Sequence, residues 1–111
     1  MVTPEMLLFL AGKMGMPNPH IHELLAGGSG VMCEDDSGKF YFIPHISDAQ
    51  FGPLVVWAPT QRLSITIWED AVLVMPKDGD EQWQEHNNTP DSIRAAAVVA
   101  ICRALGYGEK E

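Results

Sequence analysis

The C-terminal segment "TPDSIRAAAVVAICRALGYG", residues 89–108, constrains the fold more than any other part of the chain. Thr89 is a typical N-cap, Pro90 fits the first helical position, and Asp91 complements the positive end of the helix dipole. Gly106 is a stop signal, so the pattern predicts a helix of about sixteen residues, roughly 24 Å long. Apolar side chains cover most of its circumference. We expect this helix to be mostly buried, with alanines that allow close packing on a sheet.

The segment "RLSITIWEDAVLVMP", residues 62–76, gives the clearest β signal in the chain. Leu63, Ile65 and Ile67 alternate with Ser64, Thr66 and Trp68 before a turn at Glu69-Asp70, which predicts a hairpin near the centre of a sheet. The polar stretch from Pro76 to Thr89 then predicts a connection that contains an edge strand around Trp83. A second hairpin is expected in "GVMCEDDSGKFYFIP", residues 30–44, with its turn at Ser37-Gly38.

Three helix starts precede and separate these hairpins. Thr3-Pro4-Glu5 predicts a helix that ends at about Lys13 or Met14. Asn18-Pro19 predicts a short helical segment that ends at Gly27-Gly28. Ser47 and Gln50 fit a capping box for a middle helix, which Pro53 should shorten or bend.

The composition restricts the class of protein. One domain over residues 1–111 is the expectation for a chain of 111 residues, of which 46% are hydrophobic and 20% charged. A formal net charge of −8 opposes direct binding to nucleic acid or to an anionic membrane. Cys33 and Cys102 match no metal or redox pattern, which favours reduced thiols in a cytoplasm. The apolar run "MLLFLAG" is too short to cross a membrane.

The order of these elements resembles small, mostly uncharacterised bacteriophage and prophage proteins of the phage ABA-sandwich type, over roughly residues 43–106. The resemblance rests on caps and packing positions: Pro44, Ser47, Asp48, Pro90, Ile93, Ala96, Ala100 and Leu105. It implies a phage or prophage origin, a bacterial host cytoplasm and a sheet between helix layers, with no catalytic residues to carry over. We expect an α+β, α/β/α sandwich-like fold: a mainly antiparallel sheet of about 4–5 strands in two hairpins, packed by N-terminal, middle and C-terminal helices.

Four residues are the candidates for binding. Arg94 falls on the apolar arc of the C-terminal helix. It either holds an anion or partner carboxylate at a groove, or it extends to solvent near the helix start, or it pairs with Asp91 three residues back. Trp57, Trp68 and Trp83 are candidates because Trp is enriched at binding hot spots. Trp68 lies opposite the Leu63 face of its strand, so both faces of that strand are covered or one is an interaction patch.

The histidines are weak candidates for a metal site. His20 and His22 would point about 200° apart on a helix, and would chelate together only if the segment were extended. A site would need His45 or His86 from elsewhere, because catalytic zinc takes three protein ligands. We expect no metal and no cofactor, and we expect His20, His22 and His45 to be solvated or to cap backbone groups.

The leading functional hypothesis is a small accessory protein that binds an unknown protein partner, with a homodimer as one form. The first alternative is an acidic decoy that mimics nucleic acid, which needs carboxylates at phosphate-like spacing. The second is a metal-dependent enzyme, which needs at least three of the histidines and nearby acids in one cleft. No nucleophile elbow or P-loop is present in the sequence.

Overall fold

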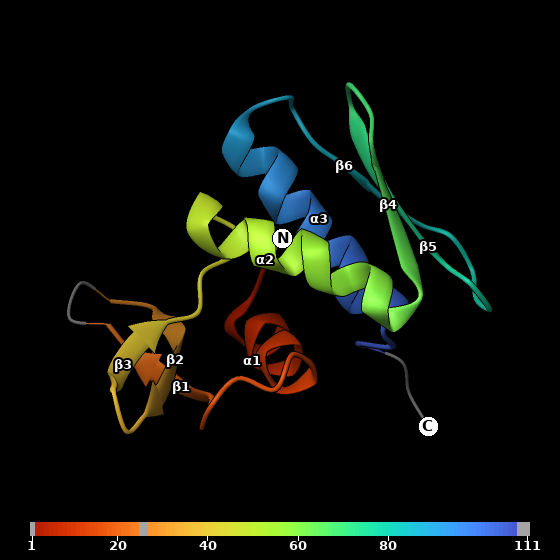
Figure 1. Ribbon diagram of the computed structural model, residues 1–111. Coiled ribbons are helices and arrows are strands. Elements are labelled where there is room, and N and C mark those ends of the chain that lie inside the picture. The colour runs from red at the N-terminus through yellow and green to blue at the C-terminus, as the bar shows by residue number, and fades with distance from the viewer. Residues whose placement is uncertain (1, 25–26, 109–111) are drawn as a thin grey trace. The chain divides into compact units, whose positions relative to one another are not determined.

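The computed structural model describes residues 2–24 and 27–108, which fall into two compact units (Figure 1). The N-terminal unit is Thr3–Ile43, and the C-terminal unit is the described chain from Pro44 onward, with Val2. Each unit combines helix with a three-stranded antiparallel sheet. The predicted α+β class with antiparallel pairing is therefore confirmed. The strand number was wrong: the described chain has six strands in two separate sheets, where we expected four or five in one.

The N-terminal unit packs one helix on its sheet. Thr3 caps the helix as predicted, because its Oγ1 accepts a hydrogen bond from the Met6 amide at 3.2 Å. Val31, Cys33 and Phe42 lie on one face of the sheet and are buried. The predicted hairpin is confirmed, but its turn lies one residue earlier than predicted: Asp36 and Ser37 form the turn, and Gly38 pairs with Asp35 as the first residue of the next strand. The elements are α1 (Pro4–Lys13), β1 (His20–Glu23), β2 (Ser29–Asp35) and β3 (Gly38–Tyr41), with strand order β1-β2-β3.

The helix predicted after Asn18 was wrong, because residues 20–23 form strand β1. Asn18 has a positive φ of 43°, whereas an N-cap residue needs an extended backbone. A helix of a few residues is unstable alone, since its first turn fixes several residues for one hydrogen bond. The segment instead pairs with β2, with His20 opposite Met32 and Ile21 opposite Val31.

The C-terminal unit contains the remaining elements. The predicted hairpin at residues 62–76 and the predicted edge strand around Trp83 are both confirmed, and the second strand of the hairpin, β5 (Ala71–Pro76), is the central strand. The closing helix ends at Ala104, one residue before the predicted end, and Thr89 and Ser92 form a capping box at its start. The elements are α2 (Asp48–Trp57), the 3-10 turn η1 (Ala58–Gln61), β4 (Leu63–Ile67), β5 (Ala71–Pro76), β6 (Gln82–Glu85) and α3 (Pro90–Ala104).

Helix α2 forms although Pro53 lies inside it. Proline removes one backbone donor, and it normally disfavours helical backbone in the preceding residue by contact with that residue's Cβ. Gly52 precedes it and has no Cβ, so that contact is absent. The predicted capping box did not form: Ser47 is the N-cap, but its side chain makes no capping hydrogen bond.

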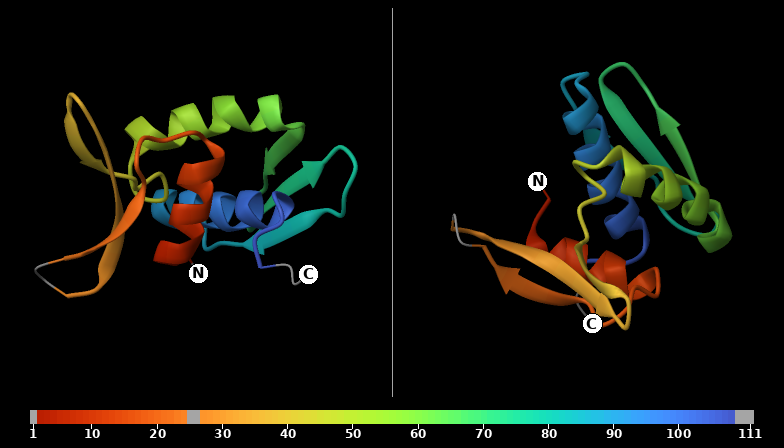
Figure 2. Two further views of the ribbon diagram at one scale, coloured as in Figure 1. Left: turned by 90° about the horizontal axis from the view of Figure 1, so that it is seen from below. Right: turned by 60° about the vertical axis from the view of Figure 1, so that its left-hand side comes forward.

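Helix α3 covers one face of the β4-β5-β6 sheet and lies alongside these strands in the views of Figure 2. Arg103 donates a hydrogen bond to Oε1 of Gln84 at 3.1 Å, which identifies the Gln84 side of β6 as the side that faces α3. Val72 and Val74 share that side through the strand register and are fully buried. Seven residues of α3 from Ala96 to Cys102 are also buried, as the sequence predicted.

Candidate functional site

The second face of the β4-β5-β6 sheet is the candidate site. Side chains alternate between the faces of a strand, so residues paired with Leu73 point away from α3. Thr66 and Trp83 are those partners, one on each neighbouring strand. Trp68 follows β4 on the same side, with its amide bonded to the Ala71 carbonyl at 2.7 Å. We call this surface the open face; its members are Ser64, Thr66, Trp68, Ala71, Leu73, Met75, Glu81, Trp83 and Glu85.

The open face exposes large apolar side chains. Trp68 and Trp83 each keep 52% of their surface accessible, and Met75 keeps 41%. Leu73, in the central strand, is nevertheless buried at 8%, since its neighbours on the face surround it. Half-exposed tryptophans around a buried leucine are typical of an interaction patch, because aromatic residues concentrate at interfaces.

Carboxylates border Trp83 on this face. Glu81 and Glu85 lie two residues before and after Trp83, so alternation places all three on one side. The Trp83 indole Nε1–H donates a hydrogen bond to Oε2 of Glu81 at 3.0 Å. No residue of β4, β5 or β6 is Lys or Arg, and no ion pair within the described residues involves Asp70, Glu81 or Glu85. The open face is therefore apolar with a negative border at its Trp83 end, whereas Arg62 and Lys77 lie beside Ser64 and Met75 at the opposite end.

A shallow, open depression of about 500 Å³ lies at the end of this face, lined by Asp70, Ala71, Trp83, Glu85 and His86. Hydrogen bonds of His86 hold the segments that line this depression together. The His86 amide donates to the Asp70 carbonyl at 3.0 Å, and its Nδ1 accepts from the Asn88 amide at 2.9 Å. Nε2 therefore carries the proton, which it donates to the Trp68 carbonyl at 2.8 Å. These bonds tie the end of β6 to the β4-β5 turn.

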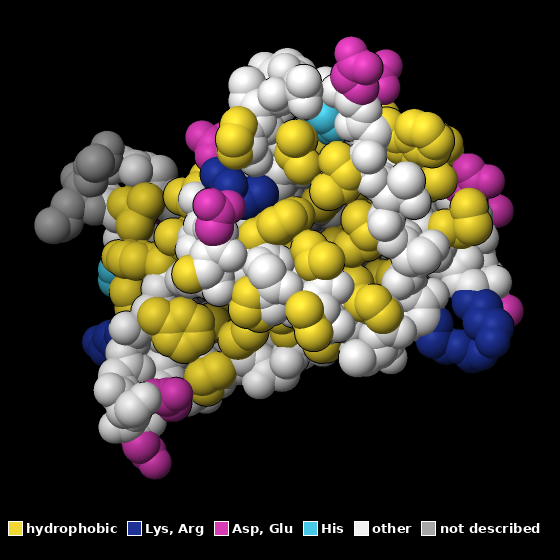
Figure 3. Space-filling model, turned by 45° about the horizontal axis from the view of Figure 1, so that its top comes forward, with side chains coloured by type: hydrophobic (Ala, Val, Ile, Leu, Met, Phe, Trp, Pro, Cys, Tyr) yellow, Lys and Arg dark blue, Asp and Glu magenta, His cyan; other side chains and the backbone are white. Residues whose placement is uncertain are grey.

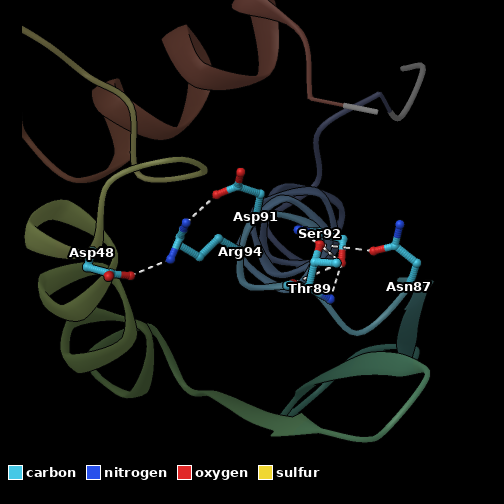
Figure 4. A network of polar contacts seen from close by, with 6 residues as sticks. All are labelled: Asp48, Asn87, Thr89, Asp91, Ser92 and Arg94. Carbon is cyan, nitrogen blue, oxygen red and sulfur yellow. Dashed lines mark hydrogen bonds and ion pairs between the residues drawn. The ribbon is translucent and has the colours of Figure 1, made fainter.

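Arg94 connects two helices (Figure 4). Its guanidinium pairs with Asp91 in the first turn of α3, and with Asp48 at the start of α2. The Arg94 side chain is only 11% exposed, whereas both carboxylates are largely exposed. The pairing with Asp91 is one of the predicted alternatives. Asp48 is a partner that the sequence did not suggest, because it lies 46 residues away.

Trp57 does not belong to the open face. It ends α2 and is partly buried, and its carbonyl accepts a hydrogen bond from the Thr60 hydroxyl at 2.6 Å. A separate apolar region includes Val56 of α2, which is 75% exposed. Figure 3 shows hydrophobic side chains gathered around α2 and the β4-β5 hairpin, with acidic side chains mostly toward the margins.

Of the weak metal candidates, His20 and His22 lie on strand β1 of the N-terminal unit, and His45 belongs to the C-terminal unit. Because β1 is extended, His20 and His22 lie on the same side of it, which is the condition set for joint chelation. His20 Nδ1, however, lies 2.9 Å from the Asn18 carbonyl oxygen, and the His22 ring contacts Tyr41. No three His, Cys, Asp or Glu side chains of residues 2–24 and 27–108 are grouped so that they could hold a metal.

His45 should make stability depend on pH. Burial lowers the pKa of His45 below its ordinary value of 6.5, and its Nδ1 is buried without a partner among the described residues. Below pH 6.5 the unfolded chain takes up a proton at this site more readily than the folded protein. The free energy of unfolding should therefore fall as the pH drops from about 7.5 to 5.5.

Urea denaturation at several pH values measures this effect. In His45→Gln the free energy of unfolding should decrease less over that pH interval than it does in the wild type. The exposed His22 provides the control, since His22→Gln should keep the wild-type slope. An unchanged slope in His45→Gln would mean that another group causes the dependence.

The two cysteines offer no reactive thiol. Cys33 in β2 and Cys102 in α3 are buried, and neither forms a disulfide. Burial raises the pKa of Cys33, and it raises that of Cys102 to about 12. Both thiols therefore stay protonated at neutral pH, and the thiolate is the nucleophilic form.

Comparisons of this chain with protein families, curated proteins and solved structures found no match. No helix within the described residues has both the length and the apolar character to cross a membrane. The candidate site therefore rests on the geometry of the open face.

Proposed function

We propose that this protein is a small protein-interaction module that binds a partner protein through the open face. The carrying observation is that the sheet buries one face under α3 and leaves two half-exposed tryptophans on the other. Exposed aromatic side chains that surround a buried centre are the usual anchors of an interface.

The charge of the surface supports a partner with basic residues. Glu81 and Glu85 border the tryptophans, Asp70 lies at the adjoining turn, and the strands carry no Lys or Arg to neutralise them. A partner with apolar side chains bordered by Lys or Arg complements this surface in both shape and sign. Acidic borders also speed association with a basic partner at low salt.

The proposal extends to the biological setting. The resemblance to small phage and prophage proteins, carried by positions such as Pro44, Asp48 and Pro90, supports an accessory role in the cytoplasm of a bacterial host. A homodimer through the open face is disfavoured by charge, because two copies would bring acidic borders together.

Selection of peptides from a random twelve-residue library tests the proposal. The wild type should enrich peptides in which apolar residues are flanked by Lys or Arg. Trp68→Ala with Trp83→Ala should bind these peptides at least about 30-fold more weakly, because truncating a hot spot costs about 2 kcal/mol or more. Val56→Ser is the matched control, since it removes an exposed apolar side chain outside the open face.

Two outcomes would overturn the proposal. One is enrichment of the same peptides by the double tryptophan variant. The other is loss of binding in Val56→Ser with retention in the double variant. Circular dichroism of each variant verifies that the fold is intact.

A further inference from the structure

We infer that the depression beside Trp83 binds an arginine side chain of the partner. This inference rests on the proposed function and specifies the group that the partner inserts. It combines three observations: an aromatic ring at the surface, two acidic residues that line a depression, and the absence of Lys and Arg from strands β4, β5 and β6.

The aromatic component is Trp83. Its side chain is 52% exposed and lines the depression, and its only polar atom is already bonded to Glu81. The indole ring itself is therefore the part that remains for a ligand. Tryptophan is the side chain that attracts a cation most strongly through its ring face.

The charged component is the pair Asp70 and Glu85. Both line the depression together with Trp83, and they reach it from different elements: Asp70 from the β4-β5 turn and Glu85 from β6. The bonds of His86 to the Asp70 and Trp68 carbonyls hold these elements in register. Two carboxylates and a ring around one space match a planar guanidinium, which stacks on the ring and donates hydrogen bonds in its plane.

No Lys or Arg among the described residues lines this depression. Arg62 pairs with Asp78, Arg94 with its two aspartates, and Arg103 with Gln84. The depression has space for a guanidinium, because its volume of about 500 Å³ exceeds that of one side chain. A partner therefore supplies the positive group.

Two tripeptide probes test the inference: acetyl-Leu-Arg-Leu-amide and its citrulline counterpart, which has nearly the same shape but no charge. The Trp83 indole N–H signal in NMR titrations reports binding. The arginine probe should bind about five- to tenfold more tightly than the citrulline probe, from one cation–π contact and partly exposed ion pairs. Glu85→Gln should weaken the arginine probe about threefold or more and leave the citrulline probe unchanged.

Asp36→Asn is the matched control, because it removes one exposed carboxylate in the N-terminal unit. It should leave both probes unchanged. Citrulline binding within twofold of arginine, no detectable binding of the arginine probe, or equal effects of Glu85→Gln and Asp36→Asn would overturn the inference. If the library still yields peptides that need Trp68 and Trp83, the proposed function stands although the arginine site fails.

Discussion

Val74→Asp is expected to unfold the C-terminal unit, whereas Met75→Asp is expected to leave it folded. The two residues are neighbours in β5, and they point to opposite faces of the sheet. Val74 is fully buried on the α3 face, and Met75 is 41% exposed on the open face. A carboxylate at position 74 would be buried without a cation, which costs more than about 4 kcal/mol. This is a large part of a typical domain stability of about 5–15 kcal/mol.

Met75→Asp keeps its carboxylate in water. It should cost about 1–2 kcal/mol, from the lost partial burial of Met75 and the low β-propensity of Asp. Circular dichroism and urea denaturation of both variants check the prediction. Similar losses in the two variants would mean that the faces of β5 are not distinct, and the definition of the open face would then fail.

Ile101→Ala is expected to give the second large loss of stability, about 2–5 kcal/mol. Ile101 is fully buried in α3, so truncation removes apolar contacts and leaves a cavity. Ile67→Ala is the matched control, because Ile67 is 49% exposed and loses much less burial. The control should lose only about 1 kcal/mol.

Urea denaturation monitored by circular dichroism compares these two variants. The midpoint should shift strongly for Ile101→Ala and slightly for Ile67→Ala, with similar slopes. Equal shifts would contradict the assignment of α3 as the helix that covers the sheet core, since the burial of Ile101 would then make no difference.

Features set by neighbouring residues could be predicted from the sequence. Thr89, Pro90 and Ser92 specify the start of α3 within four positions, and the alternation around Ile65 specifies β4. Strand β1 was predicted as a helix because Asn18 and Pro19 look like a helix start. The pairing of β1 with β2, which stabilises the strand, cannot be read from these two residues. Long-range pairing decides between strand and helix for such a short segment.

The candidate site could be predicted only in part. The alternation of side chains along β4 predicts that Trp68 lies on the face opposite Leu63. In the structure, helix α3 does not cover that face, and Trp68 is 52% exposed. Glu81, Trp83 and Glu85 alternate with glutamines in the pattern "EQWQE". This spacing places the three side chains on one face only if the segment is a strand, as β6 is. The bridge from Arg94 to Asp48 could not be predicted, because it depends on the packing of α2 beside α3.

The most direct test of the open face uses the three tryptophan indole N–H signals as reporters in one NMR titration. A peptide selected by the wild type is added to the ¹⁵N-labelled protein. The account predicts that the signals of Trp68 and Trp83 shift together as the peptide binds, while that of Trp57 on α2 stays in place. A shift of the Trp57 signal alone, with Trp68 and Trp83 unchanged at saturating peptide, would contradict it.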